Sequence, residues 1–491
     1  MRTLEDLRFD NTYARLPEAF SARLEPTPFT SLPYLVSFNP DAAALIDLDP
    51  EEAQRPQFVQ YFSGARMLSG SEPLAMLYAG HQFGHYVPQL GDGRAILLGE
   101  VRNERGEKWD LHLKGAGQTP FSRHGDGRAV LRSSIREYLG GEAMHGLGIP
   151  TTRALCLVGS EDEVLREEGV ESGAMLVRLA PSHVRFGSFE VFAHRRQTAN
   201  LRQLADYVIE HHFPHLQGAS DGYFNFFREV VQRTAELVAK WQAVGFAHGV
   251  LNTDNMSILG LTLDYGPFGF LDDYDAGLIC NHSDRGGRYA FHRQPNIANW
   301  NLHALGEALL SLISEDEVKE ALASYEPALV AHYTDLVRAK LGLTEWREED
   351  GALLSGILEI MQANHVDYTT FFRGLGALPS AGPDSNSQLS ELFTDRLEFD
   401  AWADKYRRRL RSEASKDPER RALMDRVNPR YVLRNHLAHT AISMATEKRD
   451  YSEIDKLRKL LRNPYEDQPG MEHYAAAPPD WSKSLVVGCS S

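Results

Sequence analysis

The spacing of hydrophobic and polar residues changes near residue 80 and again near residue 200. Residues 1–75 mix short apolar runs with Pro- and Asp-rich turns and show no period that predicts a regular element. Between 80 and 180, Gly-rich turns separate runs that predict strands: RAILLGEV, KWDLHLKG, RALCLVG and GAMLVRLA. One stretch, 132–147, has helical spacing and ends before Gly148. We expect a small mixed sheet with one helix in this part.

Beyond residue 200 the pattern is mostly helical. Apolar residues recur at helical spacing over 223–244, 299–313, 316–341 and 352–363. Residues 249–277 differ, because Asp, Asn and Gly dominate and predict turns. The tail is charged and helical before a Pro-rich end.

Composition narrows the class of protein. Hydrophobic residues make up 42% and charged residues 24% of 491 positions, which is typical of a globular protein of several lobes. The 52 basic and 68 acidic residues give a net charge of −16, so we expect neither nucleic acid nor membrane as a partner. Acidic residues near the start and only three cysteines predict a cytoplasmic protein without a disulfide framework.

The strand-like run KWDLHLKG carries a candidate phosphate ligand. Alternation puts Trp109, Leu111 and Leu113 on one face and the polar residues, including Lys114, on the other. Glu137 follows on the predicted helix, where it is placed to pair with this lysine. Taken alone, an exposed lysine and an exposed glutamate explain the same pattern.

A second cluster lies in HGVLNTDNMSILGLTLDYG. Asn255 and Asp264 flank a strand-like run and offer hard oxygen ligands suited to Mg²⁺. Protein kinases hold their metal ions with an Asn and an Asp that occur in this order along the chain. The alternative is a solvated turn. Val250 stands where a kinase has its catalytic Asp, so either the enzyme is inactive or a neighbouring carboxylate, Asp254, replaces that base.

Other motifs are weaker. GDGRA at 91–95 and again at 125–129 resembles an anion-binding nest, with Arg94 and Arg128 available for phosphate, although such turns are common. HQFGH at 81–85 has the spacing of a zinc protease but lacks its Glu, so we expect its histidines to pack the first Gly-rich loop.

Together these motifs resemble the selenoprotein O family of protein adenylyltransferases, kinase-fold proteins once classed as pseudokinases. The resemblance covers nearly the whole chain. It rests on LHLKGAGQTPFSRHGDGRAVLRSSIREYL, FGSFEVFA, HGVLNTDNMSILG, DYGPFGFLD, NPRYVLRN and the near-terminal Cys489.

The resemblance implies an α+β, protein-kinase-like fold of two lobes. We expect an N-terminal extension over 1–80, an N-lobe with the nucleotide-binding loops over 81–195, a mainly helical C-lobe over 196–415, and a helical region with a Cys-bearing tail over 416–491.

It also implies the reaction and its residues. ATP would bind flipped, and AMP would pass to Ser, Thr or Tyr hydroxyls of proteins while pyrophosphate leaves. Asp254 would accept the proton, Asn255 and Asp264 would hold Mg²⁺ or alternatively Mn²⁺, and Glu137 would orient Lys114. The expected ATP-binding residues are Gly91, Gly93, Arg94, Lys114, Asp126, Gly127, Arg178, Arg185 and Asp264.

Two other functions fit the residues: a conventional phosphotransferase, and a catalytically silent nucleotide-binding pseudokinase. We expect a monomer, because no coiled coil or apolar stripe is evident. Cys280 lies just beyond the metal-binding motif and Cys489 in the tail. Their positions, and the redox-active residue that family members carry at the terminal site, predict a reversible regulatory disulfide between them.

Overall fold

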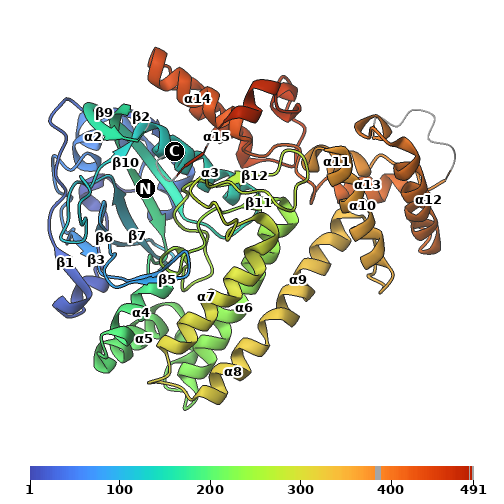
Figure 1. Ribbon diagram of the computed structural model, residues 1–491. Helices are drawn as coiled ribbons and strands as arrows, with labels where there is room; N and C mark the ends of the chain where they lie inside the picture. Colours follow the sequence, from blue (N-terminus) through green and yellow to red (C-terminus); the bar gives the residue numbers. More distant parts are fainter. Residues whose placement is uncertain (168, 382–388, 486, 489–491) are drawn as a thin grey trace.

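An antiparallel sheet of eight strands fills one side of the molecule in the computed structural model, which describes residues 1–167, 169–381, 389–485 and 487–488 (Figure 1). Its order is β1-β3-β6-β7-β10-β9-β2, with β8 paired to β10; the two-stranded pairs β4–β5 and β11–β12 lie outside it. The strands are β1 (Ser21–Arg23), β2 (Tyr34–Phe38), β3 (Leu74–Met76), β4 (Gly80–Gln82), β5 (His85–Val87), β6 (Ala95–Arg102), β7 (Lys108–Lys114), β8 (Ala129–Val130), β9 (Arg153–Arg166), β10 (Gly169–Ala180), β11 (Phe246–Ala247) and β12 (Gly269–Phe270).

The sheet is larger than the sequence pattern predicts, and it is antiparallel throughout. The four expected strands are present as β6, β7, β9 and β10, but β1 and β2 from the first 75 residues also join it. These two strands have three and five residues. Runs that short contain too few alternations to be distinguished from a loop.

Strand β7 has an apolar and a polar face, as its alternation predicts. Leu111 and Leu113 pack into one hydrophobic core with Phe58 and Phe62 from the N-terminal part of the chain. The opposite face carries the even-numbered residues toward helix α3 (Leu131–Gly146), where Lys114 pairs with Glu137. The predicted alternation is confirmed, and it turns a row of polar side chains into the protein interior.

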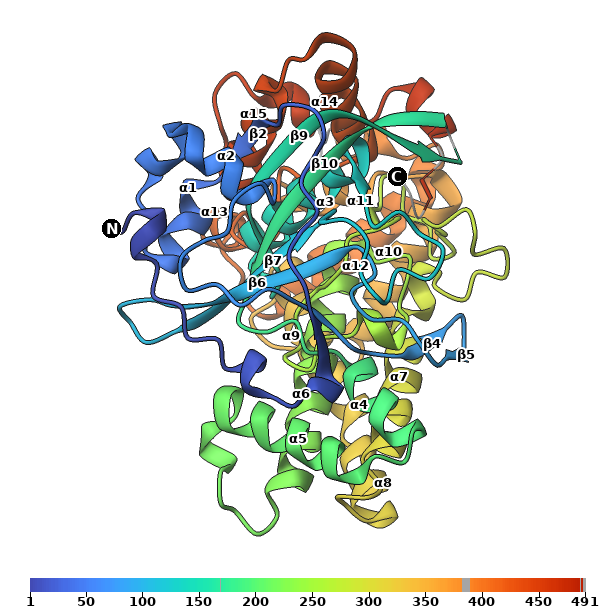
Figure 2. The same cartoon turned by 90° about the vertical axis from the view of Figure 1, so that its left-hand side faces the viewer.

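Helices make up most of the chain after β10 (Figures 1 and 2). Figure 1 shows α10–α13 grouped beyond the end of α9, away from the sheet. Besides α3, the helices are α1 (Pro40–Ala43), α2 (Pro56–Phe62), α4 (Phe186–His194), α5 (Thr198–His212), α6 (Gly222–Val244), α7 (Gln294–Ala308), α8 (Glu315–Ala323), α9 (Tyr325–Lys340), α10 (Asp350–Asn364), α11 (Tyr368–Leu375), α12 (Arg396–Ser412), α13 (Asp417–Met424), α14 (Asn435–Lys448) and α15 (Ser452–Arg462). No helix within the described ranges is long and apolar enough to cross a membrane.

Prolines explain where the helix predictions miss. The stretch predicted as one helix over 316–341 is two, α8 and α9, because Pro327 has no N–H to bond back to Ala323 and instead occupies the first turn of a new helix. Helix α7 begins at Gln294, earlier than predicted, with Pro295 in its first turn. The predictions for α3, α6 and α10 agree with the structure to within two residues.

Candidate active site

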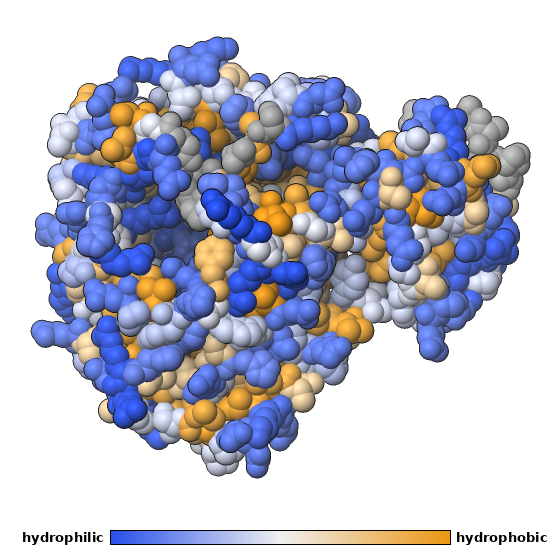
Figure 3. Space-filling view, in the orientation of Figure 1, coloured by the Kyte–Doolittle hydropathy of each residue, from blue (hydrophilic) through white to orange (hydrophobic). Residues whose placement is uncertain are grey.

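A cleft of about 820 Å³ opens between the sheet and the loops of residues 250–267. Figure 3 shows a hydrophilic hollow on this side of the molecule. The cleft brings together most of the residues that the sequence singles out, although they are up to 173 positions apart. Those lining it are Gly91, Gly93, Arg94, Lys114, Asp126, Gly127, Arg178, Arg185, Asp254, Asn255 and Asp264.

Lys114, which lines the cleft, forms a buried ion pair with Glu137. Lys114 ends β7, and Glu137 lies on α3, which packs on that face of the sheet. Burial lowers the pKa of Lys114, and the nearby Arg94 and Arg178 oppose its charge further, while Glu137 counteracts both. Burial alone would raise the pKa of Glu137, but Lys114 and Arg178 bring it below its ordinary value. Glu137 is therefore ionised, and its bond to Lys114 joins the helix to the strand.

Two arginines converge on Asp264. Arg178 on β10 and Arg185 at the start of α4 each bond one oxygen of its carboxylate. Arg178 also donates to Glu137 Oε1 (3.0 Å), which joins the two ion pairs into one network. Burial would raise the pKa of Asp264, but Arg185, Arg178 and Lys114 hold it well below the ordinary value. This carboxylate stays ionised.

Asp264 adopts a left-handed backbone conformation, with φ of 55°. Non-glycine residues rarely adopt this conformation, and it persists only where the surroundings enforce it. Here His248 bonds the carbonyl of Leu263 (2.9 Å) and so ties the segment to the preceding loop. The arrangement turns the Asp264 side chain toward the two arginines.

Asp254 also lines the cleft, beside Arg185. It lies in a short 3₁₀ turn (Thr253–Asn255), and its backbone carbonyl accepts a bond from Arg185 (2.8 Å). Burial raises the pKa of its carboxyl to about 7, against smaller opposing effects of Arg185 and Gln82. A carboxylate with a pKa near neutrality is suited to accept a proton.

Asn255 and Asp264 are the candidate metal ligands. Asn255 Nδ2 donates to the carbonyl of Val250 (3.1 Å), so its amide oxygen remains available. No group of three or more His, Cys, Asp or Glu side chains in the described part of the chain could hold a metal by itself. Mg²⁺ is commonly held by one or two protein oxygens together with substrate phosphates. The hard-oxygen pair fits that mode of binding.

The two Gly-rich loops border the cleft, and their arginines differ. Gly127 requires its residue type, since its φ is 71° and an added Cβ would lie 2.1 Å from the Gly117 carbonyl carbon. Arg94 is exposed in the cleft. Arg128 instead donates to the carbonyls of Thr27 (2.7 Å) and Pro28 (2.8 Å), so its guanidinium holds the N-terminal segment.

Sequence reasoning missed a second layer of buried polar groups. His112 accepts a bond from Arg178 at Nδ1 (2.8 Å) and donates from Nε2 to Asp92 (3.0 Å). It stacks on His183, which bonds Asp110 (3.0 Å). Burial lowers the pKa of His112 to about 4, so this ring is neutral. The alternation along β7, which puts its even-numbered polar residues on one face, was the sequence signal that could have identified them.

The structure describes only one of the two cysteines in the predicted disulfide. Cys280 is half-buried beside the cleft, and burial raises the pKa of its thiol to about 12. Cys489 lies outside the described residues. Val487, two positions earlier, accepts a bond from the backbone N–H of His282 (3.2 Å). The pairing of Cys280 with Cys489 stays a prediction.

Comparison with known proteins assigns the chain to a family. The model of the family described as "Protein adenylyltransferase SelO" matches residues 3–462. The chain is 62% identical over all 491 residues to the protein nucleotidyltransferase YdiU of Myxococcus xanthus, and both chains are covered completely. It is 56% identical to the YdiU proteins of Thiobacillus denitrificans and Thioalkalivibrio sulfidiphilus, again over the whole of each chain. The chain belongs to the SelO family, and it is by that membership a protein nucleotidyltransferase.

Proposed function

We propose that this protein transfers AMP from ATP to Ser, Thr or Tyr hydroxyls of other proteins. The bond between the α-phosphorus and the bridging oxygen breaks, pyrophosphate leaves, and a new bond joins the α-phosphorus to the acceptor oxygen. The observation that carries the proposal is one cleft that brings a network of three cations and two carboxylates together with Asp254, a further carboxyl of raised pKa.

The cationic wall suits a triphosphate. Lys114, Arg178 and Arg185 form ion pairs with two carboxylates, those of Glu137 and Asp264. Their surplus charge, with that of Arg94, stabilises phosphate oxygens in the ground state and pyrophosphate as it leaves. Asp254 accepts the proton of the attacking hydroxyl. Mg²⁺, or Mn²⁺ in its place, would be held by Asn255 and Asp264 and would neutralise phosphate charge.

We further propose a kinase-like arrangement in which the nucleotide lies in the reverse orientation. In its support, Lys114 lies on a strand of an antiparallel sheet, Glu137 lies on the helix packed against it, and the Asn255 and Asp264 segments follow in that order. Reversing the nucleotide puts its α-phosphorus, not its γ-phosphorus, next to Asp254. The expected lobes of residues 81–195 and 196–415 belong to this proposal.

ATP labelled at either the α- or the γ-phosphate tests the reaction. Label from the α-position on protein, with pyrophosphate released, is the expected result. Label from the γ-position on an acceptor would instead identify a phosphotransferase. Nucleotide binding without any transfer would identify a silent scaffold. Either of these two results contradicts the proposal.

A further inference from the structure

Contrary to the sequence-based prediction, the HQFGH motif does not pack the Gly-rich loop of residues 91–95. It forms the β4–β5 hairpin, in which Gln82 pairs with His85. His81 turns away from the cleft, bonding Glu190 of α4 (2.9 Å) and packing edge-on against Trp300 of α7. His85 is exposed. The sequence-based expectation for these histidines is therefore wrong, and the hairpin needs another explanation.

The hairpin is fastened to the loop that carries Asp254. His81 N–H donates to Thr253 Oγ1 (2.7 Å), and Phe83 N–H donates to the hydroxyl of Tyr289 (2.8 Å). Gly80 permits this close approach, because an added Cβ would lie 2.8 Å from Thr253 Oγ1. The hairpin is therefore tied to Thr253 directly and, through the hydroxyl of Tyr289, to Asn252 of the same loop (2.5 Å).

Gln82 is the point of contact with Asp254 itself. Its Nε2 donates to Asp254 Oδ2 at 3.2 Å, and both residues line the cleft. The other oxygen, Asp254 Oδ1, is buried and has no hydrogen-bond partner among the described residues. A buried acceptor without a donor is costly, and in a residue that lines a cleft it is available to accept a donor from a bound ligand.

Phe83, next along the hairpin, marks the same wall. It is 39% exposed, and it is the exposed aromatic side chain among the described residues that line the cleft. Its backbone is left-handed, with φ of 51°, although a bulky residue disfavours that conformation. The bonds of its N–H to the Asp254 side of the cleft hold it there.

We propose that the β4–β5 hairpin forms the acceptor side of the active site: Gln82 holds Asp254 Oδ2 so that Oδ1 receives the acceptor hydroxyl, and Phe83 packs against the acceptor segment that carries it. The inference rests on the proposed AMP transfer to protein hydroxyls. Gln82 is a positioning residue, because it acts through Asp254. The hydroxyl proton passes to Oδ1 while its oxygen bonds the α-phosphorus.

Positioning predicts a specific kinetic signature. Gln82→Met keeps the length and packing of the side chain and removes the donor. The Asp254 carboxylate then loses its fixed orientation, and small misplacements of a reacting group cost large factors in rate. We expect kcat to fall about tenfold or more, with the Kd for ATP changed less than twofold. Phe83→Ala should raise the KM for the acceptor several-fold with little change in kcat.

The experiment measures transfer of α-label from ATP to a reduced and alkylated carrier protein rich in Ser, Thr and Tyr, with nucleotide Kd measured separately. His85→Ala is the matched control, because His85 pairs with Gln82 in the same hairpin but is exposed and absent from the cleft lining. Gln82→Asn, which keeps an amide on a shorter arm, should recover part of the lost kcat.

Each outcome decides the matter. A kcat of Gln82→Met within twofold of the unmodified protein overturns the role of Gln82, and an unchanged acceptor KM in Phe83→Ala overturns that of Phe83. A parallel fall of kcat in His85→Ala assigns the effect to hairpin folding and overturns the inference. If the unmodified protein transfers no α-label, the proposed function fails and the inference fails with it.

Discussion

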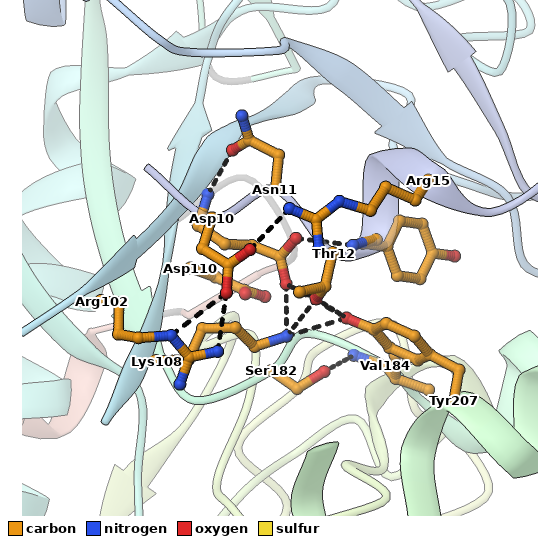
Figure 4. Close-up of polar contacts among 12 residues, drawn as sticks. Asp10, Asn11, Thr12, Arg15, Arg102, Lys108, Asp110, Ser182, Val184 and Tyr207 are labelled. Carbon is orange, nitrogen blue, oxygen red and sulfur yellow. Dashed lines mark hydrogen bonds and ion pairs between the residues drawn. The ribbon is translucent and has the colours of Figure 1, made fainter. Parts of the chain in front are cut away.

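Strand β7 carries a buried lysine at each end, and the two have opposite surroundings. At its start, Lys108 Nζ bonds Glu100, the hydroxyl of Thr12 (2.6 Å) and the hydroxyl of Tyr207 (2.9 Å). Figure 4 shows Thr12 of the N-terminal segment and Tyr207 of α5 converging on Lys108 of the sheet. One cation meets one carboxylate, and protein hydroxyls complete its coordination.

Lys114 at the other end also pairs with a glutamate, and it is as deeply buried. Here, however, two arginines join the network, so three cations share two carboxylates, and the cluster borders a cleft. Burial and ion pairing do not distinguish the two ends. The difference is surplus positive charge beside a cavity, which an anionic ligand can neutralise.

The largest expected effect separates the two lysines by activity. Lys114→Met should lower AMP transfer by at least about a hundredfold, because it removes a cation from the phosphate-binding wall. Lys108→Met should leave kcat and the Kd for ATP within about twofold. Labelled transfer and nucleotide titration provide the measurement. Equal losses of activity in the folded variants would remove the distinction drawn between the two clusters.

The second expected effect is a difference in the free energy of unfolding between the two lysine variants. Lys108→Met leaves Glu100 buried without its cation, and breaking a buried pair in this way costs about 3–5 kcal/mol. Lys114→Met should cost less, because Arg178 also bonds Glu137 (3.0 Å) and remains to neutralise it. Urea unfolding followed by circular dichroism measures both free energies. The expected order is reversed if Lys114→Met proves the less stable variant.

A third variant changes the surplus charge directly. Asp264→Ala removes the carboxylate between Arg178 and Arg185 and a candidate metal ligand, so transfer and metal-dependent ATP binding should be lost. Binding of pyrophosphate without metal should instead tighten several-fold at low salt, because the cations lose an internal competitor. Isothermal titration at two ionic strengths measures this, since screening weakens the gain. Weaker metal-free binding would show that Asp264 organises the arginines more than it competes with the anion.

The two lysines also show what the sequence can and cannot predict. Alternation along KWDLHLKG assigned Lys114 to the polar face, and the structure confirms that face. Lys114 was singled out because a Gly-rich loop follows it and Glu137 lies on the next helix. Nothing local marks Lys108 as buried, since the hydroxyls that bond it lie 96 and 99 positions away. Pairing over such distances is set by tertiary packing, which a periodicity does not encode.

The same limit applies to the cleft. Short motifs with local chemistry, such as Asp254-Asn255 and Asp264, could be recognised from sequence and lie together in the structure. The contact of Gln82 with Asp254 spans 172 positions, and it depends on a hairpin of two three-residue strands. A hairpin that short leaves no periodic signal, and the spacing of its histidines pointed to the wrong chemistry.

The smallest expected effect concerns Asp254, whose side chain accepts a hydrogen bond from the amide of Gln82 and not from a cation. Its folded pKa of about 7 lies above the ordinary value near 3.8, so the folded protein binds more protons than the unfolded chain between these pH values. Stability therefore falls as pH rises through this window, and the cost is fully present above pH 7. Asp254→Asn removes that charge.

We expect the variant to be about 1–4 kcal/mol more stable than the unmodified protein at pH 8, where the upper end is the full shift of the pKa at about 1.4 kcal/mol per unit. At pH 4 the gain should vanish, because Asp254 is then protonated in the folded protein. Urea unfolding in metal-free buffer at the two pH values gives the difference. A gain in stability of the same size at both pH values would show that the substitution acts through packing. A gain that appears only at pH 8 shows that the protein keeps the Asp254 charge in the cleft at a cost to its own stability.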